Sequence, residues 1–368
     1  MLKVLAVFGT RPEAIKMCPL VLELRKRKNI ECVTCLTGQH KEMLHQVMKV
    51  FHIKENYNLD IMKPGQSLSD ITVNVIGGID QVLEKEHPDI VLVHGDTTTS
   101  FAAALSAFYC QIPVGHIEAG LRTYNIKSPF PEEYNRQAVD LVSSMCFAPT
   151  ETAKNNLLRE GKEAGSIFVT GNTVIDALKL TVDQDYQDEH LRWADGSRLL
   201  LLTTHRRENL GESMEHIFKA VLRIIKENTD VKVIFPVHKN PWIRKIAKQY
   251  LGDVDRIRMI EPLDVIAFHN YMAKSHLILT DSGGVQEEAP FLGIPVLVLR
   301  DTTERPEGLE AGTLKLVGTE EGTVYQTTTQ LLTDKNLYLK MSQSVNPYGD
   351  GNASLRIADI LSKQKWRK

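Results

Sequence analysis

The sequence predicts an α/β protein with two domains, each built around a parallel β-sheet. Short apolar runs that suit buried strands alternate with helical stretches along the whole chain, which is the pattern of βαβ units. Several of these runs end in glycine, polar or capping residues that open the next helix. The 368 residues are enough for two sizeable cores, and the polar run 183–198 separates the two halves.

The predicted elements follow one another in the same order in both halves. The first half has strands over residues 2–8, 32–37, 90–93, 114–117, 146–148 and 167–170. In this half, one helix begins at residue 14 and another at residue 41, and a third ends near residue 86. Two more helices follow residues 96 and 131, and another covers 151–159. The second half has strands over 199–203, 231–236, 257–260, 277–280, 295–299 and 314–317. In this half, one helix ends at residue 228 and another begins at residue 241. Three more helices cover 262–272, 285–292 and 353–364.

Composition excludes several classes of protein. Apolar residues make up 42% and charged residues 24%, and the net charge is −2 with mixed signs, so nothing points to nucleic acid or an acidic membrane. No apolar run approaches the length of a membrane span, and the apolar start reads as a strand rather than a signal peptide. The odd number of cysteines, five, suggests reduced thiols in the cytoplasm. Cys32 and Cys35 lie three apart on a strand, so we expect their thiols to diverge.

The stretch 277–299 combines a buried strand, a Ser282-Gly283-Gly284 turn and a helix. Backbone N–H groups at a helix N-terminus bind phosphate or other anions, and the glycines let a ligand approach closely. Glu287 and Glu288 follow, and a carboxylate there can accept hydrogen bonds from a ribose. This pattern favours a nucleotide, and the alternative is an ordinary capped helix with acids that suit its dipole.

Acidic and basic side chains collect at other predicted strand ends, where α/β sheets bind ligands. Asp96 follows one strand as either an N-cap or a cleft carboxylate, Glu118 follows the next, and Glu132 opens a helix. Three carboxylates in one cleft suggest proton chemistry. The cations at such ends are Arg11, Lys16 and the cluster His205-Arg206-Arg207, which suits a diphosphate.

Two cofactor classes have no signature in the sequence. The first strand-to-helix turn is not the G-x-G-x-x-G that holds NAD, and the Cys32–Cys35 pair has no second pair to complete a zinc site. We therefore expect neither a nicotinamide cofactor nor a metal.

Eight motifs spread from the first strand to the last helix resemble those of the non-hydrolysing UDP-N-acetylglucosamine 2-epimerases. They are GTRPEAIKM at Gly9, HGDTTT at His94, VGHIEAGLRT at Val114, PEEYNR at Pro131, HRREN at His205, TDSGGVQEEAP at Thr280, RDTTERPEG at Arg300 and NPYGDG at Asn346. The resemblance implies two Rossmann-like domains in a GT-B arrangement, with the active site in the interdomain cleft. We expect a first domain over residues 1–171, a second over 172–351, and a C-terminal helix, about 352–368, that packs back on the first.

The resemblance also implies the activity. Members interconvert UDP-N-acetylglucosamine and UDP-N-acetylmannosamine for bacterial surface polysaccharides, as cytoplasmic homodimers, by eliminating UDP and adding it back through a glycal. Its implied catalytic residues are Asp96, Glu118, Glu132 and His205. Its implied substrate-binding residues are Arg11, Lys16, Arg136, Phe268, Ser282, Gly283, Gly284 and Glu288. Binding is expected to draw the two domains together.

Some bacterial members are activated by UDP-N-acetylglucosamine at an allosteric site. The chain resembles them at Gln39, Arg206 and His238, and at Glu132, but Glu42 and Gly65 stand where those members have glutamine and arginine. Three other functions fit the same fold: a hydrolysing epimerase, a GT-B glycosyltransferase that uses a UDP-sugar, and an inactive nucleotide-sugar sensor.

Overall fold

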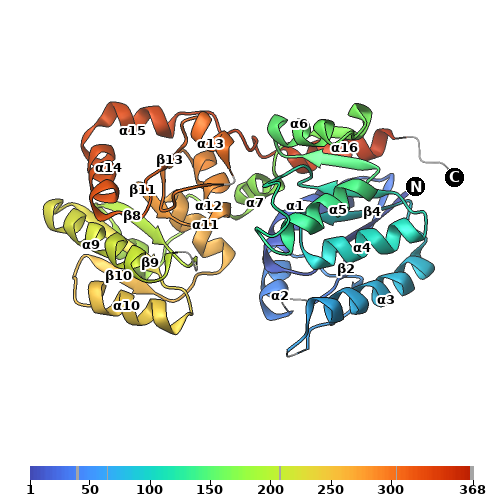
Figure 1. Cartoon of the computed structure of the whole chain (residues 1–368), viewed down its shortest axis with the longest axis horizontal. Coiled ribbons are helices and arrows are strands. Elements are labelled where there is room, and N and C mark those ends of the chain that lie inside the picture. Colours follow the sequence, from blue (N-terminus) through green and yellow to red (C-terminus); the bar gives the residue numbers. More distant parts are fainter. Residues whose placement is uncertain (39–40, 64, 207–208, 304, 365–368) are drawn as a thin grey trace. The chain divides into compact units, whose positions relative to one another are not determined.

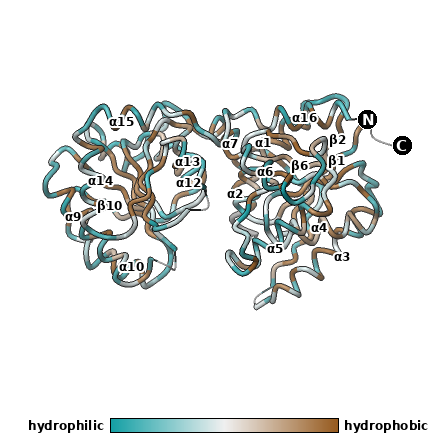
Figure 2. Tube along the Cα trace, turned by 45° about the horizontal axis from the view of Figure 1, so that its top comes forward, coloured by the Kyte–Doolittle hydropathy of each residue, from teal (hydrophilic) through white to brown (hydrophobic). Residues whose placement is uncertain are grey.

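The computed structural model describes residues 1–38, 41–63, 65–206, 209–303 and 305–364 of the chain. It divides into two compact units, Met1–Leu180 with the C-terminal segment from Tyr348, and Thr181–Pro347. Each unit has its own parallel sheet with helices on both faces (Figure 1). Apolar residues concentrate along the central strands of each unit (Figure 2). The predicted α/β class with two parallel sheets is confirmed.

The first sheet has seven strands in the order β3-β2-β1-β4-β5-β6-β7. The strands are β1 (Leu2–Phe8), β2 (Ile30–Leu36), β3 (Tyr57–Asn58), β4 (Ile90–His94), β5 (Val114–Ile117), β6 (Met145–Ala148) and β7 (Ile167–Val169). Strand β1 pairs with β2 on one side and β4 on the other, so the winding direction reverses there. Such a reversal opens a crevice at the carboxyl ends of the strands, which is where ligands bind in open α/β sheets.

Two groups of helices cover this sheet. They are α1 (Arg11–Lys26), α2 (Lys41–Val50), α3 (Leu68–Glu86), α4 (Thr98–Tyr109), α5 (Glu132–Val142), α6 (Glu151–Arg159), α7 (Thr173–Thr181) and α16 (Ala353–Lys363), with the 3₁₀ turn η1 (Ala164–Ser166). Helices α3, α4 and α5 pack side by side, and their apolar faces enclose one core with β1, β2, β4 and β5. Helix α1 packs against α2 and α16, so the C-terminal helix returns to the first unit.

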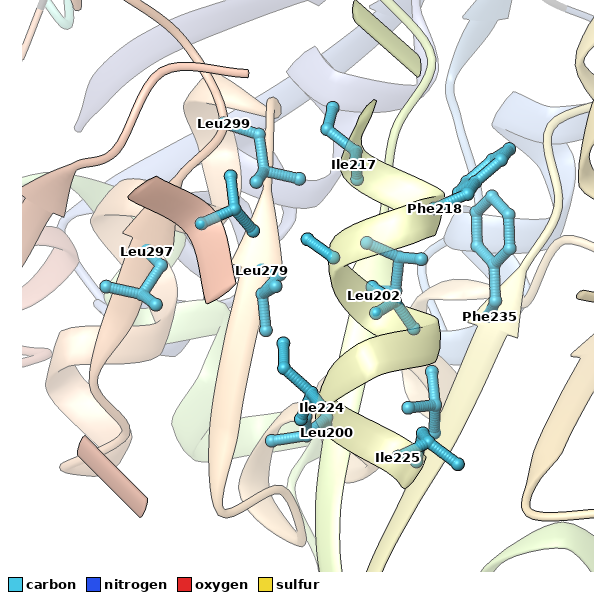
Figure 3. Packing of buried hydrophobic residues seen from close by; sticks show 14 of the residues in the cluster. Leu200, Leu202, Ile217, Phe218, Ile224, Ile225, Phe235, Leu279, Leu297 and Leu299 are labelled. Atoms are coloured by element: carbon cyan, nitrogen blue, oxygen red, sulfur yellow. The ribbon is translucent and has the colours of Figure 1, made fainter. Parts of the chain in front are cut away.

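The second sheet has six strands in the order β10-β9-β8-β11-β12-β13. The strands are β8 (Arg198–Thr203), β9 (Val231–Pro236), β10 (Ile257–Ile260), β11 (Leu277–Thr280), β12 (Val296–Val298) and β13 (Leu314–Leu316). The helices are α8 (Glu189–Ala194), α9 (Glu212–Glu227), α10 (Pro241–Leu251), α11 (Val265–Ala273), α12 (Gly283–Glu288), α13 (Pro306–Glu310), α14 (Glu321–Thr333) and α15 (Lys335–Ser342), with the 3₁₀ turn η3 (Ala289–Leu292). Leucine and isoleucine side chains from β8, β11, β12 and α9 form the core of this unit (Figure 3).

Several details differ from the sequence-based expectation. The unit boundaries fall after Leu180 and after Pro347, so α7 lies with the first unit, whereas we expected the boundaries after residues 171 and 351. A short helix, α8, lies within the polar run 183–198. The predicted helix over 285–292 begins earlier, at Gly283, and changes to a 3₁₀ turn after Glu288. Pro290 explains the change, since it has no N–H to continue the α-helical hydrogen bonds.

Cys32 and Cys35 behave as the strand geometry predicts. Both are buried in β2, and all five cysteines of the chain are free thiols. Cys35 packs into the core beneath α3 and α4, and Cys32 is not part of that core. Burial raises the pKa of both thiols to about 12, so neither is a reactive thiolate.

Candidate active site

In the first unit, the predicted carboxylates lie at the carboxyl ends of two neighbouring strands and at a helix start. Asp96 lies just beyond β4 and Glu118 follows β5 directly, and these strands pair in register up to His94 and Ile117. Asp96 and Glu118 therefore share one edge of the sheet. Glu132 is the first residue of α5 and is half-buried.

Buried Glu13 joins the two turns on either side of the winding reversal. Its carboxylate accepts hydrogen bonds from the backbone N–H groups of Gly9 and Thr10, at 3.0 and 2.7 Å. It also accepts from the hydroxyls of Thr97 and Ser100, at 2.7 and 3.0 Å. Burial raises the pKa of Glu13, and these four bonds oppose that effect. The turns after β1 and β4 are thus held in one fixed arrangement beside Asp96.

Glu118 is held by side chains from two other segments. Lys16 of α1 forms an ion pair with its carboxylate, and the Asn172 side-chain amide donates to the same oxygen at 2.8 Å. The backbone of Glu118 has a φ of 68°, a left-handed conformation that is uncommon for a residue with a side chain. Strain of this kind gathers at functional sites, where surrounding contacts maintain it. Glu118 is therefore a fixed carboxylate with a cation beside it.

His94, the last residue of β4, lies next to this carboxylate. Its Nε2 atom is 3.7 Å from a Glu118 oxygen, which is beyond hydrogen-bond distance. Among the described residues and their contacts, this buried Nε2 has no hydrogen-bond partner. Burial lowers the pKa of His94 to about 3, so the ring is neutral. A neutral imidazole with an unused nitrogen beside Glu118 is suited to contact a bound ligand.

Asp96 is paired with Arg136 of α5. The Arg136 guanidinium also donates to Glu133 at 3.2 Å, and the Asn135 side-chain amide donates to the Asp96 carbonyl at 2.9 Å. Glu133 is fully buried and accepts from the backbone N–H groups of the 123–124 segment. Consecutive residues of one helix thus fix both the side chain and the backbone of Asp96.

A buried polar network links the backbone segments that carry Asp96 and Glu118. The ring of His116 in β5 lies 2.6 Å from an Asp140 carboxylate oxygen through Nδ1 and 2.7 Å from the Gly95 carbonyl through Nε2. The other Asp140 oxygen accepts from the Gly120 N–H at 3.1 Å and pairs with Arg122 at 2.8 Å. The residue before Asp96 is therefore linked to the turn that carries Glu118.

In the second unit, α12 begins in the predicted glycine turn. Ser282 is the N-cap residue but makes no side-chain capping bond, and its own N–H donates to Thr280 Oγ1 at 2.9 Å. The N–H groups of Gly283 and Gly284 follow in the first helical turn, where an α-helix offers them no internal acceptor. These two groups are the ones that the local geometry presents to an anion.

Arg305, which precedes α13, lies directly over Gly283. A Cβ added at Gly283 would lie 2.9 Å from the Arg305 guanidinium carbon, so only glycine leaves room for it. The Arg305 Nε atom donates to the buried carboxylate of Glu287 at 2.8 Å. Glu287 therefore positions this cation.

Glu288 and Phe268 lie on neighbouring segments of the second unit. A Glu288 carboxylate oxygen is 3.9 Å from Nε2 of His269, whose Nδ1 is 2.6 Å from the Thr181 hydroxyl. His269 is buried, and Phe268 beside it in α11 is half-buried. Helix α11 packs against η3, which follows Glu288 directly, so the acid and the aromatic ring belong to adjoining elements.

His205 follows β8 and lies close to the start of α12. Its Nδ1 atom is 3.1 Å from the buried carboxylate of Asp281, and its ring stacks on His238, with centroids 5.9 Å apart. Arg206 donates from Nε to the Asp281 carbonyl at 2.9 Å. Arg207 lies outside the described residues.

The predicted allosteric residues are placed only in part. Arg206 and exposed His238 lie within the His205 cluster. Gln39 lies outside the described residues, and so does the side chain of Glu42 in α2. Arg11, a predicted substrate-binding residue of the first unit, is the first residue of α1 and is half-buried. Thr10 and Glu13 on either side of it form the capping box of this helix.

Several supporting residues were not predicted from the sequence. His94 and His116 stand within strands, where a buried histidine in a motif is as easily a core residue as a functional one. Asn172 was only seen as a residue leaving the first domain, although its position just beyond β7 was a signal. Arg305 and Asp281 gave no signal beyond their presence in polar loops.

Metal-binding and membrane-spanning features were searched over the described part of the chain. No group of three or more histidine, cysteine, aspartate or glutamate side chains there is arranged to hold a metal ion. None of the helices in that part is both long and apolar enough to cross a membrane.

Comparisons with known proteins show what the chain is similar to. Residues 22–362 match the family described as UDP-N-acetylglucosamine 2-epimerase. A Bacillus subtilis (strain 168) protein of that name is 61% identical over 98% of this chain and 95% of its own length. The crystal structure of UDP-GlcNAc 2-epimerase from Neisseria meningitidis bound to UDP-GlcNAc has a TM-score of 0.90 and 51% identity, over 99% of this chain and 100% of that one. The S. aureus MnaA–UDP structure has a TM-score of 0.90 and 54% identity, over 98% and 96% of the two chains.

Proposed function

The chain belongs to the UDP-N-acetylglucosamine 2-epimerase family, and from that premise we propose that it interconverts UDP-N-acetylglucosamine and UDP-N-acetylmannosamine. One observation carries the proposal. Asp96 and Glu118, each paired with a cation, lie at the ends of adjacent strands of one sheet. The reaction inverts one carbon, C2 of the sugar, and therefore needs proton transfer groups fixed beside it.

The chemistry of the substrate explains why C2 is not inverted by direct removal of its proton. The C2 hydrogen is not next to a carbonyl, so removing it directly is difficult. Eliminating UDP across C1 and C2 gives a glycal, and adding UDP back with a proton on the opposite face inverts C2. This route is non-hydrolysing because UDP returns to the same sugar. Asp96, Glu118 and Glu132 would supply the proton transfers.

We assign the UDP part to the second unit. The N–H groups of Gly283 and Gly284, with Arg305 over the turn, would bind the diphosphate, since both are positive and aimed at one place. Glu288 would accept the ribose hydroxyls and Phe268 would contact the uracil. His205 would contact the leaving phosphate, while Arg11, Lys16 and Arg136 would bind the substrate from the first unit.

Turnover in heavy water is the most direct test of this function. The chain is incubated with UDP-N-acetylglucosamine in D₂O and followed by proton NMR. We expect UDP-N-acetylmannosamine to appear with deuterium at C2. Accumulation of free N-acetylmannosamine would support a hydrolysing epimerase instead, and transfer of the sugar to an added acceptor would support a glycosyltransferase. Binding without turnover would support a sensor.

We predict that neither a metal nor NAD is required. The elimination and re-addition move protons and UDP but no net electrons, so an oxidant has no role. Dialysis against EDTA should leave the epimerisation rate unchanged, and added NAD should not raise it. Loss of activity in EDTA that a divalent ion restores would contradict this prediction.

We also propose a homodimer through the outer faces of α3, α4 and α5. These adjacent helices carry large apolar side chains that are exposed in one chain, namely Val73 (68%), Phe108 (53%), Tyr109 (69%) and Leu141 (80%). Exposed apolar residues that gather over neighbouring elements mark interaction surfaces. The five free thiols suit the cytoplasm, where we place the reaction.

Sedimentation velocity tests the dimer. The wild-type chain should sediment with twice the 41.5 kDa mass of one chain. Replacing both Tyr109 and Leu141 by glutamate should give monomers, because burying two charges opposes association. Leu355→Glu, an exposed leucine on α16, is the matched control and should leave the dimer intact. A monomeric wild-type chain would contradict the proposal.

A further inference from the structure

Asp281 is a fully buried carboxylate at the end of β11 that collects several donors from the loop after β8. Its Oδ2 atom accepts from the Thr204 hydroxyl at 2.9 Å and from the backbone N–H groups of His205 and Arg206 at 2.9 and 3.0 Å. The side-chain amide of Asn209 donates to the same oxygen at 3.0 Å. One oxygen of Asp281 thus holds four described residues of this loop.

The other oxygen, Oδ1, faces the ring of His205. Its distance to Nδ1 is 3.1 Å, and the backbone N–H of the same residue lies 3.2 Å away. Burial alone would raise the pKa of Asp281, but its hydrogen bonds and the charge of His205 outweigh burial and hold the pKa below its ordinary value. An ionised carboxylate can only accept hydrogen bonds, so with Oδ1 3.1 Å from Nδ1 it favours a proton on that nitrogen of His205.

This arrangement determines what the second ring nitrogen can do. With Nδ1 protonated, a neutral ring has a lone pair on Nε2, and only the doubly protonated ring has a hydrogen there. The His205 side chain is 43% exposed, so Nε2 is accessible to a ligand. An anionic phosphate oxygen accepts hydrogen bonds and is repelled by a lone pair. His205 therefore suits a phosphate only when it is an imidazolium.

Other charged groups near the ring were considered among the described residues. His238 stacks on the ring at 25° between planes, and burial together with the charge of His205 lowers the pKa of His238. Arg206 bonds to the Asp281 backbone, and Arg244 acts on His238 from α10. Asp281 is the one anion that contacts the ring within this set, so it controls the position of the proton.

We infer that Asp281 is a positioning residue that fixes His205 with a proton on Nδ1. His205 then donates a hydrogen bond from Nε2 to the diphosphate of UDP only as an imidazolium. The inference rests on the proposed function and deepens it. It adds a coupling between UDP binding and proton uptake. Because binding takes up one proton, the affinity for UDP should fall as pH rises.

The Asp281→Asn variant reverses this arrangement. Four donors converge on the Oδ2 position, so the amide oxygen should remain there and the amide nitrogen should take the Oδ1 position. That nitrogen donates, so Nδ1 of His205 must accept and the neutral ring carries its proton on Nε2. The variant then offers a donor to phosphate without charging the ring, and the pH dependence should disappear.

The first measurement is ¹⁵N NMR of the full chain labelled at its 12 histidines. The His205 signal is assigned by its loss in His205→Asn. At alkaline pH the wild-type ring should show the Nδ1–H tautomer, and Asp281→Asn should show the Nε2–H tautomer. Thr204→Val, the matched control, removes one donor to Asp281 but keeps its charge, and should keep the wild-type tautomer.

The second measurement is calorimetry with UDP between about pH 7.5 and 9, above the titration of a phosphate near 6. Wild-type affinity should fall by up to about tenfold per pH unit, the limit for release of one proton. Asp281→Asn and His205→Asn should show a flat dependence, whereas His238→Asn should keep the slope.

The outcomes separate this inference from the function beneath it. A wild-type ring with the proton on Nε2, or UDP binding by the wild type without pH dependence, would overturn the role of Asp281. A wild-type chain that does not bind UDP at all would overturn the proposed function, and the tautomer would still decide the role of Asp281. The wild-type tautomer needs no variant, so an Asp281→Asn chain that fails to fold leaves the test in place.

Discussion

Replacing Glu118 by glutamine is expected to lower kcat for epimerisation at least about a hundredfold, the lower range for a group that transfers a proton. Glutamine keeps the shape of the side chain and can still bond to Asn172, but it neither accepts nor delivers a proton. The rate of deuterium entry at C2 in D₂O measures the effect. A variant with full activity would remove Glu118 from the mechanism.

A control is needed because Glu118 also has a structural partner. Its ion pair with Lys16 is mostly buried, with 9% and 13% of the two side chains exposed. Removing one partner of a buried pair leaves an uncompensated charge, which costs about 3–5 kcal/mol when burial is complete. The double variant Glu118→Gln with Lys16→Met restores charge balance. We expect it to recover thermal stability relative to the single variant but not turnover, which would show that the lost turnover does not come from instability.

The same expectation applies to Asp96→Asn and Glu132→Gln, which should each cut turnover at least about a hundredfold and still fold. The partner of Asp96, Arg136, also forms an ion pair with Glu133. Arg136 therefore keeps one carboxylate in Asp96→Asn. Early thermal unfolding of either variant would instead assign that residue to the structure.

The sequence was a good guide to the elements and to the charged residues after strands. Buried strands are apolar and end in recognisable turns, so β4, β5 and β11 were found with their following residues Asp96, Glu118 and Ser282. A sequence pattern does not reveal which side chains meet across the sheet. The partnership of Lys16 with Glu118 spans 102 positions, and that of Asp281 with Thr204 spans 77.

Two further features depend on three-dimensional contacts that no local pattern contains. Glu118 adopts a left-handed backbone, which propensity assigns to glycine or asparagine rather than glutamate. Arg305 lies over Gly283 because Glu287 holds it, although η3, β12 and a loop separate Glu287 from Arg305 in the chain. The resemblance singled out Glu288 alone, and the ion pair of Glu287 with Arg305 gives its neighbour a separate place in the structure.

The glycine turn of α12 gives the second large expected effect. Glu288→Ala should weaken UDP binding by about 1.5–3 kcal/mol, the usual worth of a hydrogen bond to a charged group. That range corresponds to roughly 10- to 150-fold in Kd. During turnover the variant should also release free UDP and glycal, because the leaving group is held less firmly.

Gly284→Val should weaken UDP binding more than Glu288→Ala does, and the structure identifies why Gly284 is the better glycine to change. A side chain there is expected to block the phosphate without straining the turn. The backbone of Gly284 is not left-handed, and an added Cβ would come no closer than 3.5 Å to Glu288. The valine should therefore leave the fold intact and fill only the space of the phosphate. Gly283→Val is less informative because it would displace Arg305.

Titration calorimetry with UDP decides both variants, and thermal unfolding checks that each chain remains folded. Wild-type affinity in Glu288→Ala would mean that α12 is an ordinary capped helix whose acids only suit its dipole. Wild-type affinity in Gly284→Val would be even stronger evidence against a phosphate site in this turn. A β-branched side chain cannot share the space of a phosphate bound to the Gly284 N–H. Loss of binding with an unchanged melting temperature would assign the turn to the diphosphate.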